Sequence, residues 1–210
     1  MSWSEFSFDP LLFRGLSRQE CLSMLSCLDP VVKTYEKGEY ILSGGEAIHA
    51  VCLTMEGNVH LTREDAWGNR HLIGFAGKGE LFGESYACLP QIPLTVNAVA
   101  AEPCKIAFLD IGRVFHTCSR SCIIHQKLIE NFLSVLAGKN LTLMEKIDHI
   151  SQKTTREKVM AYLSLEAMKQ QSNSFAIPFN RQQLADYLCV ERSALSAELG
   201  KMQREGLIWF

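Results

Sequence analysis

The chain has 210 residues, a formal net charge of −2 and 47% hydrophobic residues, which excludes a disordered protein and allows one or two domains with a substantial core. Its near-neutral charge gives no indication of a polyanion partner, although residues 151–210 hold 8 Lys and Arg against 6 Asp and Glu. The sequence has no stretch of about 18 uncharged apolar residues and no basic and apolar start typical of a signal peptide. We therefore expect a cytoplasmic protein with no membrane partner.

Eight cysteines are many for a cytoplasmic chain, where disulfides are rare. Their closest spacings, Cys21-x5-Cys27 and Cys118-x3-Cys122, match no strong zinc or iron–sulfur pattern. We expect most of them to be small buried residues and expect no metal site. A thiol switch at Cys118 and Cys122 is the alternative.

The first 120 residues predict a short helix followed by β-structure. Ser17 and Glu20 form a capping box that begins a helix, and Asp29-Pro30 ends it. Residues 31–109 then show short β-rich runs, separated about every 10 residues by glycine turns, which is typical of an antiparallel sandwich or barrel, and we predict a barrel. Residues 59–62 and 71–73 flank Gly68-Asn69 and predict a hairpin.

A long helix is predicted over residues 121–150, with two apolar faces. Ile124, Leu128, Phe132 and Val135 suit packing on the barrel. The other face follows strict 4-3 spacing with one polar residue, which is typical of a two-stranded coiled coil. We predict that it is the seam of a homodimer; the alternative is a helix buried on both sides in a monomer. The predicted seam consists of Ile129, Leu133, Leu136, Asn140, Leu143, Ile147 and Ile150.

The C-terminal part predicts a helix-turn-helix. After a polar break at residues 151–154 come a helix over 155–171 and a strand-like link over 175–179. Asn180 caps a helix over 181–188, three residues make a turn, and a second helix runs from Arg192 to about Glu205, where Gly206 stops it. Ala185 is small enough for close helix contact, and Val190 fills the turn. A plain helical hairpin is the alternative.

In a helix-turn-helix the first turn of the second helix points at base edges. Arg192 is the long donor there and suits guanine, and Ser193 and Ser196 suit bases or phosphates. Arg181 and Gln182 are expected at the DNA backbone, with Lys201 as a further phosphate contact. Residues 181–205 hold four basic and four acidic residues, so tight binding requires two copies on two half-sites.

A barrel, a dimer helix and a C-terminal helix-turn-helix in this order resemble the superfamily of the cyclic-AMP receptor protein and the fumarate-nitrate reductase regulator (Crp/Fnr). The specific motifs are residues 181–196, the cassette at 79–85 and Gly206-Leu-Ile208. The resemblance implies an α+β chain with a cyclic-nucleotide-binding-like jelly-roll barrel (1–120), a dimerisation helix (121–150) and a winged helix-turn-helix (151–210). It also implies a transcription regulator with RNA polymerase as a partner, and no enzyme.

The resemblance further implies an effector pocket between the barrel and the long helix. Its expected members are Gly83, Glu84, Ser85, Leu94, Thr95, Leu133, Leu136 and Asn140. In nucleotide-binding relatives an Arg-Ser/Thr-Ala triplet neutralises the cyclic phosphate. This chain has Leu94-Thr95-Val96 there and no arginine from 71 to 112. An unpaired buried phosphate is costly, so we expect an unknown effector other than cyclic AMP, either uncharged or differently charged, and no certain cofactor. The alternative is that Gly83 and Glu84 belong to a sheet turn that binds no ligand.

The chain departs from the family in two further places. Many members have a second arginine where this chain has Ala197, so the preferred half-site is expected to differ. The sequence ends at Trp209-Phe210, where a β-wing would return, so a truncated or missing wing is expected.

Three other function classes are considered. A redox or haem sensor would use the cysteines or a histidine among His49, His60, His71, His116, His125 and His149. A sensory module would use its helix-turn-helix for protein contacts. A cupin enzyme requires a His-x-His pattern, which His49 lacks.

Overall fold

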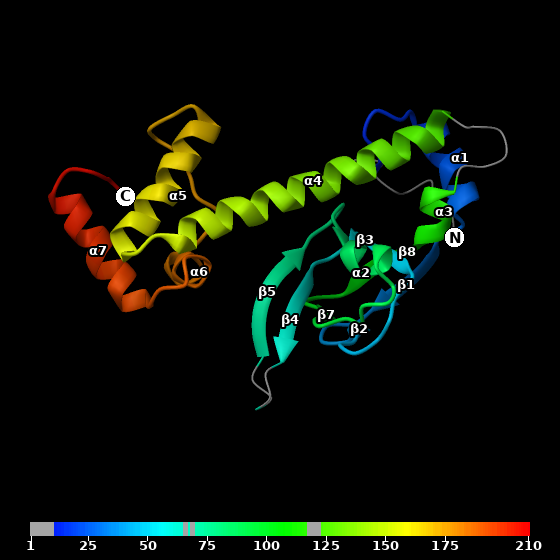
Figure 1. Cartoon of the computed structure of the whole chain (residues 1–210), viewed down its shortest axis with the longest axis horizontal. Coiled ribbons are helices and arrows are strands. Elements are labelled where there is room, and N and C mark those ends of the chain that lie inside the picture. Colours follow the sequence, from blue (N-terminus) through cyan, green and yellow to red (C-terminus); the bar gives the residue numbers. More distant parts are fainter. Residues whose placement is uncertain (1–10, 65–66, 68–69, 117–122) are drawn as a thin grey trace. The chain divides into compact units, whose positions relative to one another are not determined.

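The computed structural model describes residues 11–64, 67, 70–116 and 123–210 (Figure 1). The chain forms two compact units, Met1–Val135 and Leu136–Phe210, and helix α4 (Ile123–Ser151) contributes residues to both. No helix in the described part is long and apolar enough to cross a membrane. The expected assignment of the long helix as a domain of its own stays a prediction.

The N-terminal unit begins with the short 3-10 helix η2 (Leu11–Phe13) and helix α1 (Arg18–Leu28). The predicted capping box is confirmed: the Glu20 backbone N–H donates to Ser17 Oγ, and the Ser17 N–H donates to the Glu20 carboxylate. The pKa of Glu20 is lowered, mainly by its hydrogen bond from the Ser17 side chain. Asp29 ends the helix in a left-handed conformation.

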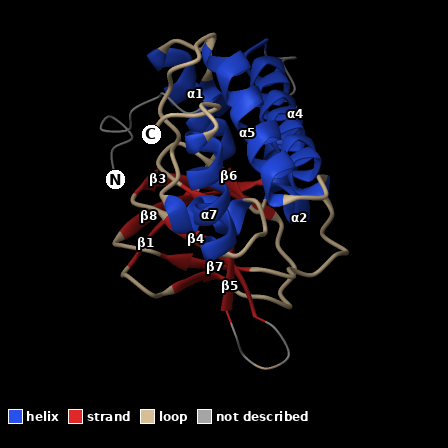
Figure 2. Ribbon diagram, turned by 90° about the vertical axis from the view of Figure 1, so that its left-hand side faces the viewer, coloured by secondary structure: helices blue, strands red, loops and turns tan. Residues whose placement is uncertain are grey.

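Among the described residues eight strands follow, and they pair in two antiparallel four-stranded sheets, drawn red in Figure 2. The first sheet has the order β1 (Val31–Tyr35), β8 (Cys104–Asp110), β3 (Ala50–Glu56) and β6 (Leu81–Phe82). The second has the order β2 (Tyr40–Leu42), β7 (Asn97–Ala100), β4 (Val59–Glu64) and β5 (Arg70–Ala76). The prediction of a closed barrel is therefore wrong: the described strands form two separate sheets. Glycine turns at this spacing suit both architectures, and only the strand pairing distinguishes them.

The core of this unit takes side chains from both sheets. Cys52, Phe82 and Ile106 come from the first sheet, and Val59 and Ala98 come from the second. Alternate residues of β4 contribute, since Val59 is fully buried and Leu61 packs against the same cluster. Burial raises the pKa of the Cys52 thiol, as expected for an apolar structural cysteine.

The predicted hairpin is confirmed, because β4 and β5 pair antiparallel from Val59↔Ala76 to Glu64↔Arg70. Leu61 pairs with Gly74 and Thr62 with Leu72, so the extra residue of a bulge, Ile73, lies on β5, whereas β4 pairs without interruption with β7. The predicted turn residues Gly68 and Asn69 lie outside the described residues.

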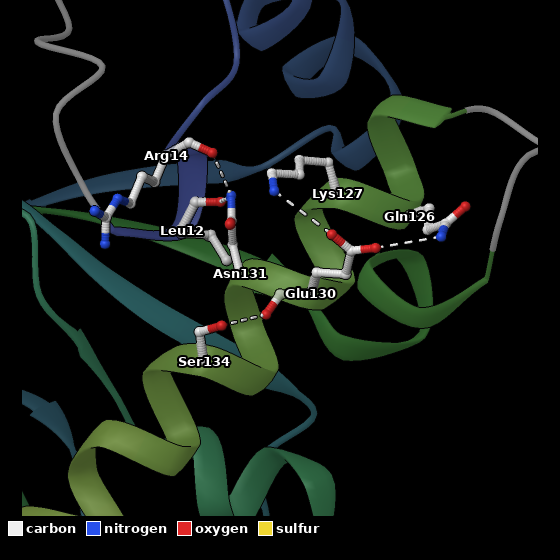
Figure 3. A network of polar contacts seen from close by, with 7 residues as sticks. All are labelled: Leu12, Arg14, Gln126, Lys127, Glu130, Asn131 and Ser134. Carbon is white, nitrogen blue, oxygen red and sulfur yellow. Dashed lines mark hydrogen bonds and ion pairs between the residues drawn. The ribbon is translucent and has the colours of Figure 1, made fainter.

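Two short helices, α2 (Glu84–Cys88) and α3 (Ile111–Phe115), accompany the sheets, and α4 follows. The predicted inner face of α4 is confirmed at Leu128, Phe132 and Val135, which are buried. Asn131 on this helix is also buried and donates to the carbonyl oxygens of Leu12 (3.0 Å) and Arg14 (2.8 Å), as Figure 3 shows. These bonds fix the η2 segment to α4.

The second unit holds the end of α4 and three further helices, α5 (Thr155–Gln170), α6 (Arg181–Tyr187) and α7 (Arg192–Arg204). The predicted polar break is confirmed: Thr154 caps α5 in a second capping box with Glu157. Residues 175–179 form no strand, so the expected strand-like link is wrong, and residues 205–210 contain no strand either. The winged form of the motif stays a prediction.

Candidate nucleic-acid interface and effector site

The helices α6 and α7 pack as the sequence predicted (orange and red in Figure 1). Asn180 caps α6, and it exchanges hydrogen bonds with Gln183 at 2.9 Å in both directions. Ala185 and Leu195 are completely buried at the contact between the helices. The shared core lies under one face of each helix and consists of Val159, Tyr162, Leu184, Ala185, Leu188, Leu195, Leu199 and Met202.

The turn between these helices is held by both backbone and side chain. Cys189 has a φ of 52°, in the left-handed region, and the Val190 N–H donates to the Ala185 carbonyl at 3.0 Å. Lys158 on α5 donates from Nζ to the carbonyls of Leu188 (3.2 Å) and Cys189 (3.4 Å). A cation that satisfies the last carbonyls of a helix stabilises that end. Lys158 therefore positions the turn, a role that the sequence did not reveal.

Ion pairs of Arg156 also join α5 to α7 and the residue that follows it. Arg156 on α5 pairs with Glu198 at 3.4 Å and also with Glu205, both of which belong to the α7 segment. The hydrogen bond between Arg156 and Glu205 lowers the pKa of Glu205 and raises the pKa of Arg156. These acidic residues, which weaken the basic character of the motif, are thus partly neutralised within the unit.

Four of the six predicted DNA contacts lie on α7 and are open to solvent. Arg192, Ser193, Ser196 and Lys201 are all exposed. Ala197, where many family members have arginine, is exposed beside them. The buried residues Leu195, Leu199 and Met202 hold the opposite face, so the helix presents the polar side chains outward.

The other two predicted contacts already have partners inside the unit. The guanidinium of Arg181 stacks over the ring of Phe210, 4.0 Å from its centroid. Gln182 donates from Nε2 to Asp186 at 2.8 Å. The structure therefore brings Arg181 to the C-terminal residues as well as to the start of α6, which the sequence did not indicate.

The predicted seam residues share one face of α4, and most of that face is open to solvent. Leu133 is 55% exposed and both Leu143 and Ile147 are 60% exposed. Asn140 is also exposed, while Ile129, Leu136 and Ile150 are half-buried. The alternative of a helix buried on both sides in a single chain is therefore wrong.

The predicted effector residues of the cassette lie at the start of α2. Gly83 has a φ of 75°, which favours glycine, and a side chain there would come within 3.0 Å of Ile48. Glu84 follows it and is buried, whereas Ser85 is exposed. Burial, and next the charge of Glu84, raises the pKa of Cys88.

The remaining predicted residues of the sheet domain separate into core and surface. Leu94 is 3% exposed and belongs to the core between the sheets, whereas Thr95 is exposed. Thr95 Oγ1 lies 2.6 Å from the Tyr86 hydroxyl and accepts a hydrogen bond from Arg63 Nη2 at 3.3 Å. Arg63 precedes residues 71–112, the range in which the sequence contains no arginine, and its place beside Thr95 was not predicted. Strand alternation along β4 was the signal that could have found it.

The cysteines of the described segments are free. Burial is as expected for Cys21, Cys52 and Cys104, but Cys88 is half-buried and both Cys27 and Cys189 are exposed, so only half of the described cysteines are buried. Cys118 and Cys122, the suggested thiol switch, lie outside the described residues. Within the described part of the chain, no group of three or more His, Cys, Asp and Glu side chains is arranged to hold a metal ion.

Two family models match the chain in the order that the fold shows. The cyclic nucleotide-binding domain matches residues 32–121, and the Crp-like helix-turn-helix domain matches residues 157–209. The Cyclic AMP receptor protein of Thermus thermophilus is 26% identical over 198 residues, which cover 94% of this chain and 87% of that protein. The nitrogen fixation regulation protein FixK of Bradyrhizobium diazoefficiens is 25% identical over 183 residues, 83% of this chain and 72% of its own.

Solved structures share the fold. CprK complexed with OCPA has a TM-score of 0.66 at 16% identity, over 89% of this chain and 85% of that one. The Catabolite Activator Protein of Thermus thermophilus has a TM-score of 0.52 at 23% identity, over 95% and 90%. A sheet domain followed by a Crp-like helix-turn-helix defines a class of transcription regulators. The chain belongs to the Crp/Fnr superfamily of transcription regulators.

Proposed function

We propose that this regulator binds double-stranded DNA as a homodimer, at two half-sites, under the control of a small-molecule effector. The first turn of α7 carries the proposal. Arg192 and Ser193 are exposed there, and Ser196 is exposed at the start of the next turn, on a helix whose other face is fixed in the core of the unit. A helix presented in this way fits the major groove.

Arg192 is proposed to read guanine through O6 and N7, and Ser193 and Ser196 to contact bases or phosphates. Lys201 is proposed as a phosphate contact further along the helix. Arg181 and Gln182 remain candidates for the DNA backbone, and Arg181 must then exchange its contact with Phe210 for a phosphate. Because the motif holds as many acidic as basic residues, one copy alone attracts DNA weakly.

The exposed face of α4 supports a second copy of this chain as the dimer partner. Its apolar residues follow coiled-coil spacing, and Leu143 and Ile147 leave much of their surface in water in a single chain. A second α4 would cover these residues and pair Asn140 with its equivalent, which favours two strands and one register. The dimer also supplies the second DNA-reading head.

The sheet unit is proposed to hold the effector, near the cassette of Gly83 and Glu84. Leu94 stands where nucleotide-binding relatives have arginine and is buried in the core, so cyclic AMP is not proposed as the effector. RNA polymerase is proposed as a protein partner, and relatives described as transcriptional activators, such as FnrA of Stutzerimonas stutzeri, support it. We propose no enzymatic activity and a cytoplasmic location.

The experiment is selection of DNA duplexes from a random library, followed by mobility shifts. The wild-type chain should enrich a sequence with two related half-sites. Arg192→Ala should lose preference at one base pair of each half-site, at a cost of about 1–3 kcal/mol. Lys201→Ala, the matched control, should weaken binding to all sequences alike and reduce the salt dependence. Selection of no sequence by the wild-type chain would contradict the proposal.

The comparisons favour this function over a sensory module whose helix-turn-helix contacts protein, because the matched relatives named above are regulators. If the helix-turn-helix served protein contacts, Arg192→Ala would leave the mobility-shift result unchanged.

A further inference from the structure

The side chain of Arg63 extends from the inner face of its strand. Along β4, Val59 is fully buried and Leu61 packs against the same core cluster. Successive side chains of a strand alternate between its faces, so Arg63 shares the face of Val59 and Leu61. It lies nearer the strand end, where it is exposed. The guanidinium group of Arg63 therefore starts from the core-facing side of β4, close to the strand end and open to solvent.

Arg63 meets two hydroxyl groups that come from other elements. Its Nη2 donates to Thr95 Oγ1 at 3.3 Å, and Thr95 Oγ1 lies 2.6 Å from the Tyr86 hydroxyl. Tyr86 belongs to α2, the helix that begins with the cassette residue Glu84, and Thr95 precedes β7. We call these three residues the Arg63 cluster. It connects β4 to both segments in which the effector residues were predicted.

The guanidinium of Arg63 has unused hydrogen-bonding capacity. A guanidinium carries five N–H donors in a planar fork, and a carboxylate or phosphate matches two of them at once. Among the residues that the structure describes, Arg63 forms no ion pair, and its one hydrogen bond goes to a neutral hydroxyl. An exposed cation with free donors and two adjacent hydroxyls suits an anionic group.

We propose that the Arg63 cluster binds an anionic group, carboxylate or phosphate, of the effector. This inference rests on the proposed effector function of the sheet unit and adds the charge of the ligand. The cation reaches the site from β4, whereas the position of the family's arginine is occupied by buried Leu94. The anion is therefore bound on the β4 side of Thr95. The cation of the proposed anion site thus comes from β4 and not from residues 71–112, where the arginine of the family's triplet was expected.

The test uses pairs of small molecules that differ in charge, with the full-length chain. Phenylacetate and phenyl phosphate are compared with neutral phenylacetamide, and cyclic AMP is compared with neutral adenosine. Binding is measured by calorimetry and by the shift of the thermal unfolding midpoint. At least one anion should bind about tenfold more tightly than its neutral partner, and the carboxylate and phosphate arms separate the two anion types.

Arg63→Gln should weaken that binding about tenfold or more, and Arg63→Lys, which keeps the charge without the fork, should weaken it less. Lys37→Gln removes an exposed cation from the β1–β2 turn and should leave binding unchanged. Unchanged thermal unfolding of unliganded Arg63→Gln shows that the fold is intact; if that variant unfolds, the Arg63→Lys result and the charge pairs decide. Equal binding of neutral partners, equal binding by Arg63→Gln, or binding of no anion at millimolar concentration would overturn the proposal.

The outcome is separable from that of the proposed function. DNA selection by the wild-type chain without Arg63-dependent anion binding would remove only this inference. Anion binding without DNA selection would retain the Arg63 cluster and remove the DNA-binding proposal. Arg63-dependent binding of cyclic AMP would support the anion site and contradict the exclusion of that nucleotide.

Discussion

His149 Nδ1, near the end of α4, lies 3.2 Å from the hydroxyl of Tyr187 on α6. The imidazole is 2% exposed, and its ring meets the edge of Tyr162 at 5.6 Å between centroids. Lys146 Nζ lies over the ring of Tyr187, 5.4 Å from its centroid. This aromatic cluster joins the end of α4 to α5 and α6, all within the second unit.

The stability of this unit should depend on pH through His149. Burial lowers its pKa, Lys169 lowers it further, and three nearby carboxylates partly oppose them. The unfolded imidazole titrates near 6.5, so below that pH the unfolded chain binds a proton that the folded unit does not. The contribution of His149 to the free energy of unfolding is therefore fully present above pH 6.5 and is lost as the pH falls below that value. The three carboxylates are Asp148, Glu145 and Glu166.

Calorimetric unfolding between pH 5 and 8 measures this effect. His149→Phe should flatten the dependence of the second unit's midpoint on pH, because no proton is then bound on unfolding at this position. His49→Phe changes an exposed histidine and should retain the wild-type slope. The prediction fails if both variants show the same slope as the wild type.

Asn131→Ala should destabilise the N-terminal unit. The buried amide supplies one donor group to the carbonyls of Leu12 and Arg14, and its loss leaves both without that donor (Figure 3). We expect the free energy of unfolding to fall by about 1–3 kcal/mol in denaturant titrations. Gln126→Ala removes only an exposed bond to Glu130 and should have little effect. A similar loss in both variants would contradict the role of Asn131.

Leu143→Asp should convert the proposed dimer to a monomer. The side chain is 60% exposed in the single chain, so the change costs little there but places a charge in the seam between two copies. Sedimentation velocity measures the mass. Gly138→Asp changes the opposite side of the helix, where an added Cβ meets nothing within 4 Å, and should remain a dimer. A wild-type monomer would refute the seam itself.

Phe210→Ala should strengthen DNA binding if Arg181 contacts the DNA backbone. The aromatic ring holds the guanidinium at 4.0 Å, and a cation–π contact at an exposed site contributes about 0.5–1 kcal/mol. Removing it frees Arg181 for phosphate, so affinity should rise a few-fold, by about that free energy. Mobility shifts measure the change. Trp209→Ala, at the exposed neighbouring position, should bind as the wild type does, and weaker binding by Phe210→Ala would contradict the prediction.

Some features of this protein are set by residues close together in the sequence, and these were predicted correctly. The capping box of Ser17 and Glu20 and the cap at Asn180 each involve two residues three positions apart. The helix periodicity of α4 and α7 likewise depends on neighbours one or two turns away. Because such contacts form within one element, their geometry follows from backbone spacing alone.

Other features depend on which elements fold against one another, and the sequence alone could not decide them. Glycine turns at regular spacing suit either a barrel or two sheets, and the pairing of β1 with β8 and of β2 with β7 decides between these. Arg63 and Thr95 are 32 positions apart, and Arg181 meets Phe210 only because the C-terminal residues return to α6. The sequence by itself determined the helix-turn-helix, its caps and the spacing of the α4 seam. Only the tertiary structure placed a cation beside Thr95 and an aromatic ring on Arg181, because a side chain's partner across the fold depends on packing and not on its distance along the chain.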